Sequence, residues 1–452
     1  MNPSDTNWSR RDFLGAAAMV AAAGCAAPAH GPAFASAPRR RTSANDKLRI
    51  GIIGCGSMGV ANLDACASQP DVVVTALCDV WQARLDPLLE RFKTTARAYR
   101  SHEDLCAAAD VDAVIVASPP HWHALHAIDV CRSGKDLYLQ KPMTLYPDEA
   151  LAVRNAVRAH DTICQIGTQI HATEHYRRMV ELVRSGYLGR IGVVRAFNVM
   201  NQGPEGLGHV PDSAPPQGLD WERWVGPARA RAFNEVIVRD AYHHGSFWDF
   251  SGGWTPGMAP HLIDLPHWAL ELGAPLSTNC SGGRYVLTDL GDVPDVQEIT
   301  WQHPNLTVTW SMSMVNSFGF DFGRGTRDRR IGIYFHGVNG TLRTNYSSHE
   351  LFAEGDLLAA APPPVEPIPP SPGHEREWLD CVRSRKQPSC NADYHCGIDL
   401  AIGLANVSYR LGRAVRFDPQ SERIVGDREA ARLARPDYRA PWRFPSEYLA
   451  ST

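Results

Sequence analysis

A glycine-rich segment with the spacing of a phosphate-binding loop stands near the start of the chain. Residues 54–59 read Gly-Cys-Gly-Ser-Met-Gly, a G-x-G-x-x-G pattern that follows an apolar run and precedes a helical one. Gly54 would permit the tight turn and Gly56 would let the backbone approach a diphosphate. Gly59 would let the helix pack on the strand. The segment therefore predicts a dinucleotide-binding loop.

An acidic residue occupies the position that selects the nucleotide. Asp79 ends the next predicted strand, 20 residues after Gly59. A carboxylate there accepts hydrogen bonds from the adenosine ribose and repels a 2′-phosphate. The diphosphate would lie on the helix N-terminus at Ser57 and Met58. We predict NAD as the cofactor, with NADP less favoured, although Arg84 is close by.

Composition bounds the class of protein. The length of 452 residues predicts two or three domains, and the content of 44% hydrophobic and 21% charged residues is typical of globular ones. With 45 basic and 49 acidic side chains the net charge is −4, so nucleic acid is not an expected partner. Only five basic residues are lysines, and one of these, Lys141, lies in a Gln-Lys-Pro segment.

The N-terminus resembles an export signal. Ser-Arg-Arg-Asp-Phe-Leu at 9–14 and the apolar stretch after it are typical of a twin-arginine signal over 1–37. The stretch is too short for a lasting membrane span, which needs ~20 apolar residues. We expect a periplasmic protein; lipid attachment at Cys25 is the alternative.

Hydrophobic periodicity predicts two domains after this signal. Alternating apolar runs and helical patterns over 47–168 predict an α/β Rossmann domain with a doubly wound parallel sheet. Longer alternating runs over 169–419, including one at 284–287, predict an α+β domain with a large, mostly antiparallel sheet. A polar tail is expected over 420–452.

Three further motifs make the chain similar to the Gfo/Idh/MocA oxidoreductases, the family of glucose–fructose oxidoreductase, without indicating one substrate. These motifs are Ser-Pro-Pro-His-Trp-His at 118–123, Gln-Lys-Pro at 140–142 and Gly-Met-Ala-Pro-His-Leu-Ile-Asp at 257–264. The resemblance implies a Rossmann domain, a second domain on an open sheet, a carbohydrate substrate bound between them, and a homo-oligomer. Gln140 replaces the family's usual glutamate, and Gly257 stands where many members have aspartate.

The resemblance also implies roles for individual residues. Lys141 would transfer the proton beside the carbon that gives up hydride, since a desolvated lysine can lose its proton and an arginine cannot. His261 would be its acid/base or hydroxyl-orienting partner, supported by Asp264. Pro119, His123, Gln140 and Lys141 are expected to border the cofactor. Gln169 and His171 are substrate candidates, because the resemblance puts the end of the 163–168 strand beside the nicotinamide.

Aromatic residues near 242–250 suit a sugar, which presents C–H faces and hydroxyl edges. Tyr242, His243 and Trp248 are substrate candidates, and the alternative is that the aromatic rings are core. Arg324 could contact an anionic substrate. We expect no metal, because the histidines of 121–126 lack a carboxylate at ligand spacing. Whether any of Cys381, Cys390 and Cys396 form a disulfide stays open.

Two functions follow from these features. We predict an exported oxidoreductase that retains NAD and oxidises a carbinol carbon of a sugar or sugar derivative. A glycoside hydrolase or lyase that uses bound NAD redox-neutrally is the first alternative, and a non-catalytic sugar-binding module is the second. Export favours either route that restores the cofactor in each cycle, because the periplasm holds no pool of free NAD.

Overall fold

The computed structural model describes residues 46–319 and 329–449. The predicted export signal with Cys25, and Arg324, lie outside these residues. Among the described helices, none combines the length and hydrophobicity that crossing a bilayer requires.

The first domain contains a six-stranded parallel sheet in the order β3-β2-β1-β4-β5-β6. Its central strands are short apolar runs that are buried on both faces, as parallel strands covered by helices must be. The strands are β1 (Leu48–Ile53), β2 (Val72–Cys78), β3 (Arg97–Tyr99), β4 (Ala113–Val116), β5 (Asp136–Gln140) and β6 (Cys164–Gly167). This confirms the predicted doubly wound parallel sheet.

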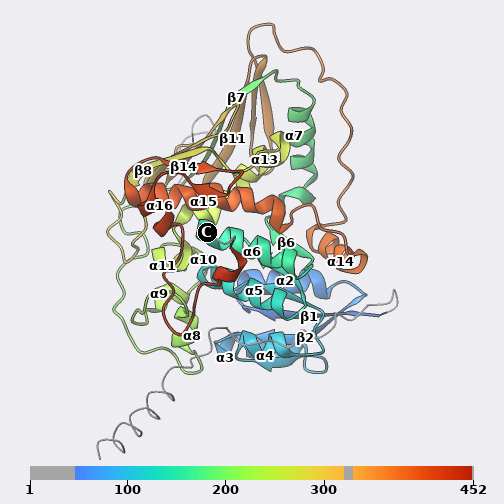
Figure 1. Ribbon diagram of the computed structural model, residues 1–452, viewed down its shortest axis with the longest axis vertical. Helices are drawn as coiled ribbons and strands as arrows, with labels where there is room; N and C mark the ends of the chain where they lie inside the picture. Colours follow the sequence, from blue (N-terminus) through green and yellow to red (C-terminus); the bar gives the residue numbers. More distant parts are fainter. Residues whose placement is uncertain (1–45, 320–328, 450–452) are drawn as a thin grey trace, which may run out of the picture. The chain divides into compact units, whose positions relative to one another are not determined.

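Helices connect these strands and cover the sheet (Figure 1). They are α2 (Ser57–Ala67), α3 (Gln82–Arg91), α4 (His102–Ala107), α5 (His123–Arg132) and α6 (Pro147–Ala159). The sequence patterns did not reveal β3 or α4. The strand is three largely exposed residues and the helix only six, so neither is long enough to show a hydrophobic period.

The second domain contains a nine-stranded, mostly antiparallel sheet in the order β13-β12-β11-β7-β10-β9-β8-β14-β15, with β7 and β10 parallel. The first strands are β7 (Ile191–Val199), β8 (Ser277–Gly283), β9 (Val296–Gln302), β10 (Thr307–Ser313) and β11 (Arg330–Gly337). The others are β12 (Gly340–Thr344), β13 (His349–Ala353), β14 (Val415–Asp418) and β15 (Arg423–Ile424). The large open sheet is thus confirmed.

The predicted strand at 284–287 is wrong. The neighbouring strand is β8, which ends at Gly283. The backbone N–H groups of residues 285–287 donate to the carboxylate of Asp295 at 2.8–2.9 Å instead of to another strand. The Asp295 side chain thus supplies the acceptors that the backbone of a neighbouring strand would have supplied. An alternating apolar pattern in the sequence cannot distinguish these two arrangements.

The nine-stranded sheet shares one hydrophobic core with helices that include α7 (Glu174–Arg184), α13 (Pro260–Leu270) and α15 (Ala392–Leu411). Figure 1 shows α15 between this sheet and α6 of the first domain. The indole Nε1 of Trp301 on β9 donates to the Ala401 carbonyl of α15 at 2.7 Å. Helix α14 (His374–Ser384) returns to the first domain and packs on α2.

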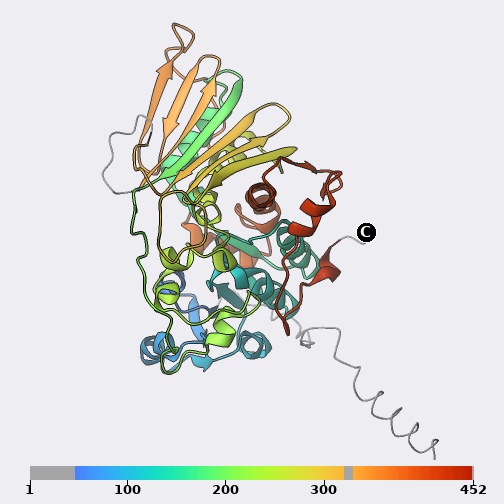
Figure 2. The same cartoon turned by 90° about the vertical axis from the view of Figure 1, so that its left-hand side faces the viewer.

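Between β7 and α12 (Trp254–Met258) the chain makes a long excursion, residues 201–253, which we call the covering segment. Its helices are α8 (Trp221–Val225), α9 (Glu235–Val238), α10 (Ala241–His244) and α11 (Trp248–Ser251). It has its own hydrophobic cluster, against which Val80 and Trp81 of the first domain pack. In Figure 2 its yellow-green helices lie beside the blue part of the Rossmann domain.

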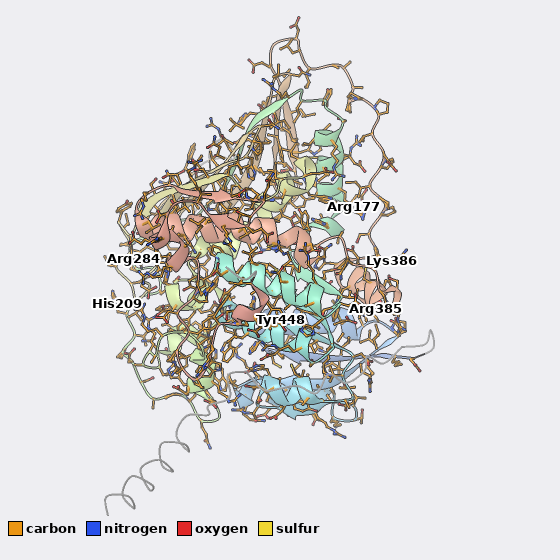
Figure 3. The ribbon with its side chains drawn as sticks, viewed as in Figure 1. Arg177, His209, Arg284, Arg385, Lys386 and Tyr448 are labelled. Atoms are coloured by element: carbon orange, nitrogen blue, oxygen red, sulfur yellow. The ribbon has the colours of Figure 1, made fainter. Side chains whose placement is uncertain are left out.

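The predicted C-terminal tail contains α16 (Arg428–Leu433) and a 3-10 turn, Ser446–Tyr448, and it contacts the first domain. Asn155 of α6 donates to the Tyr448 carbonyl at 2.7 Å, and the Tyr448 hydroxyl lies 2.7 Å from His160 Nε2. Tyr448 is labelled in Figure 3. All ten cysteines in the described residues are free thiols, so Cys381, Cys390 and Cys396 form no disulfide with one another.

Candidate functional site

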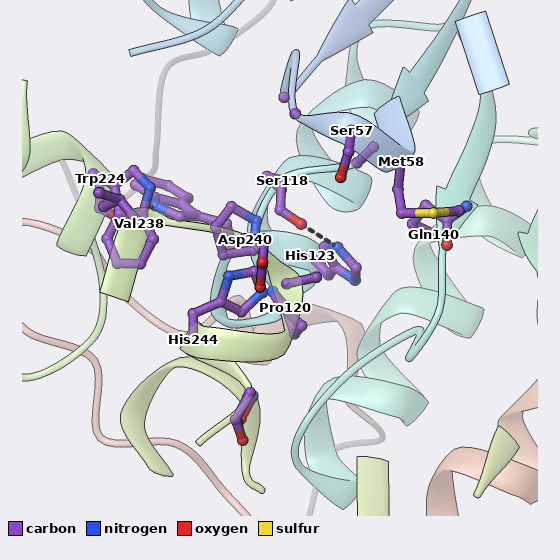
Figure 4. A pocket seen from close by; sticks show the side chains of 18 of the residues that line it. Ser57, Met58, Ser118, Pro120, His123, Gln140, Trp224, Val238, Asp240 and His244 are labelled. Carbon is purple, nitrogen blue, oxygen red and sulfur yellow. Dashed lines mark hydrogen bonds between the residues drawn. The ribbon is translucent and has the colours of Figure 1, made fainter. Parts of the chain in front are cut away.

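A cavity of about 610 Å³ is lined by the phosphate loop, the 118–123 loop and residues of the second domain. Figure 4 shows Ser57 and Met58 of the first domain in the wall of this cavity together with Val238 and His244 of the covering segment. The site is therefore built from both domains, with the covering segment as one wall.

The phosphate loop has the geometry that its glycines predict. Gly54 has φ +95°, and a Cβ there would lie 2.5 Å from the backbone nitrogen of Ser118. A Cβ on Gly59 would lie 2.1 Å from the Gly54 carbonyl oxygen. Gly56 is the N-cap of α2 and no side chain caps this helix end, so its first N–H groups are available to an anion.

Asp79 lies at the cavity wall at the end of β2. Its two carboxylate oxygens accept hydrogen bonds from the backbone N–H groups of Cys55 and Trp81, both at 2.8 Å. Burial raises the pKa of this carboxyl, and these two hydrogen bonds oppose the rise. Asp79 thus connects the phosphate loop to the start of α3. Carboxylate oxygens have further lone pairs, which leaves acceptor capacity for ribose hydroxyls.

The 118–123 loop is held to the Gln-Lys-Pro segment by His123. The two imidazole nitrogens lie 2.7 Å from the carbonyl oxygens of Ser118 and Pro142. Pro119, His123 and Gln140 all line the cavity. His123 is therefore a structural link between two walls of the site, in addition to bordering the cofactor position that the sequence predicted.

Lys141 lies in the same cavity as the phosphate loop. Its Nζ donates to the carbonyl oxygen of Gly257, on α12, at 2.9 Å. Burial lowers the pKa of Lys141 to about 8, and the positive charge of Arg329 acts in the same direction. A pKa near 8 lets the amine accept a proton near neutral pH.

Gln140, which stands beside Lys141, is fixed by hydrogen bonds. Its Nε2 donates to Asn62 Oδ1 at 2.7 Å, and its Oε1 accepts from the Lys141 backbone N–H at 3.1 Å. Asn62, on α2, donates in turn to Glu375 Oε1 of α14 at 2.9 Å. An amide suits this place because it donates and accepts at once, which a carboxylate cannot do.

His261 and Asp264 lie on the first turns of α13, but neither lines the cavity wall. Burial and the charges of Lys141 and Arg329 lower the pKa of His261 well below its usual value, so the imidazole is neutral near pH 7. Asp264 is fully buried. Burial raises its pKa, but His171 and the Tyr394 hydroxyl outweigh that effect and hold the pKa at about 2.

His171 belongs to this buried network instead of to the cavity. Its Nε2 lies 3.1 Å from Asp264 Oδ1, and the Tyr394 hydroxyl donates to the same oxygen. Ligand-type atoms of His171, Asp264 and Cys390 lie within 4.8 Å of one another, but hydrogen bonds already engage Asp264 and Cys390. Gln169 precedes His171 in a left-handed conformation, φ +55°, and does not line the cavity.

The structure separates the three aromatic and histidine candidates of the covering segment. Tyr242 lines the cavity and its ring meets that of Trp254 edge-on at 4.6 Å. The His243 ring lies 2.7 Å from the Asp240 carboxylate, outside the cavity lining. Trp248 packs against Tyr409, also away from the cavity.

Sequence reasoning did not assign several residues that line the cavity: Trp224, His244, Trp254, Met258 and Arg329. Of these residues, only His244 lies in the aromatic and histidine segment near 242–250 that the sequence indicated as a substrate site. Burial, together with His121 and Arg84, lowers its pKa to about 3. The others come from short helices or loops, where no hydrophobic period marks the face that points inward.

These features fit a dinucleotide. A loop whose glycines cannot carry a Cβ, an uncapped helix N-terminus and a carboxylate at the end of the second strand all line one cavity. Gly54, Gly56, Ser57, Met58 and Asp79 would hold the cofactor.

Comparison with known proteins supports this fit. Residues 48–168 match the NAD-binding Rossmann fold of the Gfo/Idh/MocA oxidoreductase family, and residues 324–444 match its C-terminal α/β domain. Among curated relatives, a glycosyl hydrolase family 109 protein of Shewanella baltica is 28% identical over 204 residues, 41% of this chain and 44% of that protein. An inositol 2-dehydrogenase of Burkholderia multivorans is 33% identical over 146 residues, 31% of this chain and 43% of that protein.

The chain thus spans less than half the length of these curated relatives. Among solved structures, the WlbA dehydrogenase of Bordetella pertussis, crystallised with NADH and UDP-GlcNAcA, superposes with a TM-score of 0.62. The match covers 83% of this chain and 98% of that one at 17% sequence identity. At this identity the similarity shows a shared fold alone.

Proposed function

Because the chain carries the NAD-binding Rossmann domain and the C-terminal α/β domain of the Gfo/Idh/MocA oxidoreductases, we propose that it is an NAD-retaining oxidoreductase of a sugar or sugar derivative. The reaction proposed is hydride transfer from a carbinol carbon. The observation that carries this proposal is the position of Lys141: an amine with a pKa of about 8 lines the same cavity as the phosphate loop.

NAD, when bound, supplies the hydride acceptor. The neutral amine of Lys141 takes the proton of the substrate hydroxyl while the carbinol carbon loses its hydride, so that a carbonyl forms. The Gly257 carbonyl holds the Lys141 amine in place before and after it takes the proton. His261 is neutral and lies outside the cavity lining, so we assign it no contact with the hydroxyl; Asp264, held by His171, lies one helical turn further along α13.

The second-domain side of the cavity suits a carbohydrate. Tyr242 and Trp254 contribute aromatic rings to the lining, and His244 and Tyr242 carry polar atoms. Sugars bind where aromatic surface meets a few hydrogen-bonding groups. The similarity over part of the chain to an inositol 2-dehydrogenase agrees with a polyhydroxylated substrate.

Export remains part of the proposal. The twin-arginine segment with Arg10 and Arg11 would send the folded protein to the periplasm with NAD already bound. The cofactor must then be restored within each cycle, by oxidising one substrate and reducing another. If replacing both arginines with lysine leaves export intact, this reason for retention fails.

A redox-neutral glycosidase is the second candidate. The similarity of 204 residues to a glycosyl hydrolase family 109 protein favours it. In this reaction transient oxidation acidifies a neighbouring C–H, the glycoside is eliminated, water adds, and the carbonyl is reduced again.

One experiment tests the function. The purified protein is denatured and its released small molecules are identified by mass, and the intact protein is mixed with free sugars and aryl glycosides while absorbance of reduced nicotinamide is followed. Bound NAD with lasting reduction supports the oxidoreductase. Aryl alcohol release without lasting reduction supports the glycosidase, and absence of nicotinamide together with failure to bind added NAD contradicts both.

A further inference from the structure

Arg84, on α3, lines the cavity and lies against the phosphate loop. A Cβ built on Gly56 would lie 2.6 Å from Arg84 Nη1, so the guanidinium lies directly over the N-cap of α2. Its plane also lies near the Trp81 ring, 5.2 Å from the ring centre. Within residues 46–319 and 329–449 this guanidinium forms no ion pair, and its hydrogen bond is to a backbone carbonyl.

That carbonyl belongs to the covering segment. Arg84 Nη2 donates to the oxygen of Val238, on α9, at 2.9 Å. One guanidinium thus joins the Rossmann domain to the segment that forms the opposite wall of the cavity. The contact spans 154 residues of sequence, and nothing in the local sequence around either residue indicates it.

A second row of contacts joins the covering segment to the residues after Asp79. Gln82 N–H donates to the Gly218 carbonyl and Asp220 N–H to the Val80 carbonyl, both at 3.0 Å. Arg100 Nη2 donates to the same two carbonyls, of Val80 at 2.7 Å and Gly218 at 2.9 Å. The covering segment is therefore attached along this edge, and Arg84 supplies the attachment at the loop itself.

Position distinguishes Arg84 from the other arginines that line the cavity. Arg223 pairs with Glu103 and Arg239 lies near Glu235, while Arg100 donates to backbone carbonyls and Arg329 donates to Met258 Sδ. Arg84 differs from these four because its Nη1 lies against Gly56 of the phosphate loop. A diphosphate carries two negative charges, and helix N–H groups supply only partial positive charge. An anion seated on the loop would meet the Arg84 guanidinium, which offers several donors in a fixed plane.

We propose that Arg84 is a clasp for the cofactor: one edge of its guanidinium binds the diphosphate on the loop while the other holds Val238 of the covering segment. The dinucleotide leaves only when this contact breaks. The inference rests on the proposed function in so far as that function requires bound NAD, and it identifies the residue that retains it.

The test measures how fast cofactor leaves, without using turnover. The protein is loaded with the fluorescent analogue etheno-NAD and mixed with excess NAD, and the loss of bound fluorescence gives the dissociation rate. Arg84→Ala should release the analogue about ten- to a hundredfold faster, the loss expected for one hydrogen-bonded charge contact. The release rate of Arg84→Lys should fall between those of Arg84→Ala and the wild type, because lysine keeps the positive charge but lacks the planar set of guanidinium donors.

Arg91→Ala is the matched control, since Arg91 is on the same helix and pairs with Asp64 at the surface. It should release the analogue at the wild-type rate, and circular dichroism should show all three variants folded. Unchanged release from Arg84→Ala overturns the clasp while leaving the proposed function intact. If Arg84→Ala weakens the binding of NADP and leaves the release of etheno-NAD unchanged, the guanidinium contacts a 2′-phosphate and the clasp is overturned. A wild-type protein that binds no etheno-NAD contradicts the clasp and the proposed function together.

Discussion

Lys141 Nζ donates a hydrogen bond to the carbonyl oxygen of Gly257 at 2.9 Å. A backbone carbonyl orients the amine without providing the full negative charge that would stabilise the ammonium form. The resemblance to known oxidoreductases places an aspartate at position 257 in many relatives, so the glycine changes the charge beside the lysine. Burial and Arg329 then hold the pKa of Lys141 at about 8.

Sugar oxidation should increase with pH through about 8, because only the neutral form of Lys141 accepts the hydroxyl proton. Below the pKa the logarithm of kcat/KM should rise by about one per pH unit, and above it the rate should level off. The measurement is kcat/KM from pH 6 to 10 with the substrate found by screening. A profile that is flat across pH 7 to 9 contradicts Lys141 as the base.

Gly257→Asp should move this profile to higher pH. A Cβ at Gly257 meets no atom within 4 Å and the residue lines the cavity, so a side chain can begin there without a clash. Its carboxylate would favour the ammonium form and raise the pKa of Lys141 by about 1–3 units. The activity at pH 7 should fall accordingly. Gly257→Asn, which has the same size without the charge, should leave the midpoint near that of the wild type, and equal midpoints in both variants would count against the electrostatic explanation.

Lys141→Ala should lower kcat by about 10²–10⁴-fold, the usual contribution of a positioned general base. NAD content should stay at the wild-type level, because the loop glycines and Asp79 do not depend on this side chain. Lys93→Ala is the control, since Lys93 makes a surface ion pair with Glu90. Activity that survives in Lys141→Ala would remove the central residue of the proposal.

Gln140→Glu should destabilise the protein by about 1–3 kcal/mol, because a carboxylate cannot donate to Asn62 Oδ1 and becomes buried. Burial raises the folded-state pKa of such a carboxyl above its unfolded value, so the penalty grows as pH rises above about 4.3. Thermal unfolding at pH 5 and pH 8 measures this. Gln420→Glu, at an exposed position, should leave the stability nearly unchanged. An equal loss of stability in both variants would show that the buried hydrogen bond is unimportant.

Gly54→Ala should abolish tight NAD binding. The added Cβ would lie 2.5 Å from the Ser118 nitrogen, and φ +95° is unfavourable for alanine, so the loop has to move. Gly192→Ala is the control, because no atom lies within 4 Å of its Cβ. Calorimetry with NAD compares the two. Wild-type affinity in Gly54→Ala would mean that the cofactor does not use this loop.

Much of the fold could be predicted because its signals are local. Strands β1, β2 and β5 lie where the apolar runs indicated, since a parallel strand that is buried on both faces is apolar along most of its length. The phosphate loop was recognisable for a similar reason: turn geometry and close packing demand glycine at fixed spacing. The strand expected at 284–287 was wrong because the Asp295 carboxylate accepts the hydrogen bonds that a neighbouring strand would have accepted.

The sequence alone determined which residue types were available for chemistry: the glycine loop, Asp79 and a lysine at 141. Tertiary structure decided which of them share a cavity. Tyr242 faces the cavity and Trp248 does not, although they are close in sequence, because they lie on two different short helices, α10 and α11. The contacts of Arg84 with Val238 and of Lys141 with Gly257 join residues more than a hundred positions apart. Such contacts depend on how whole domains pack, and no local pattern encodes them.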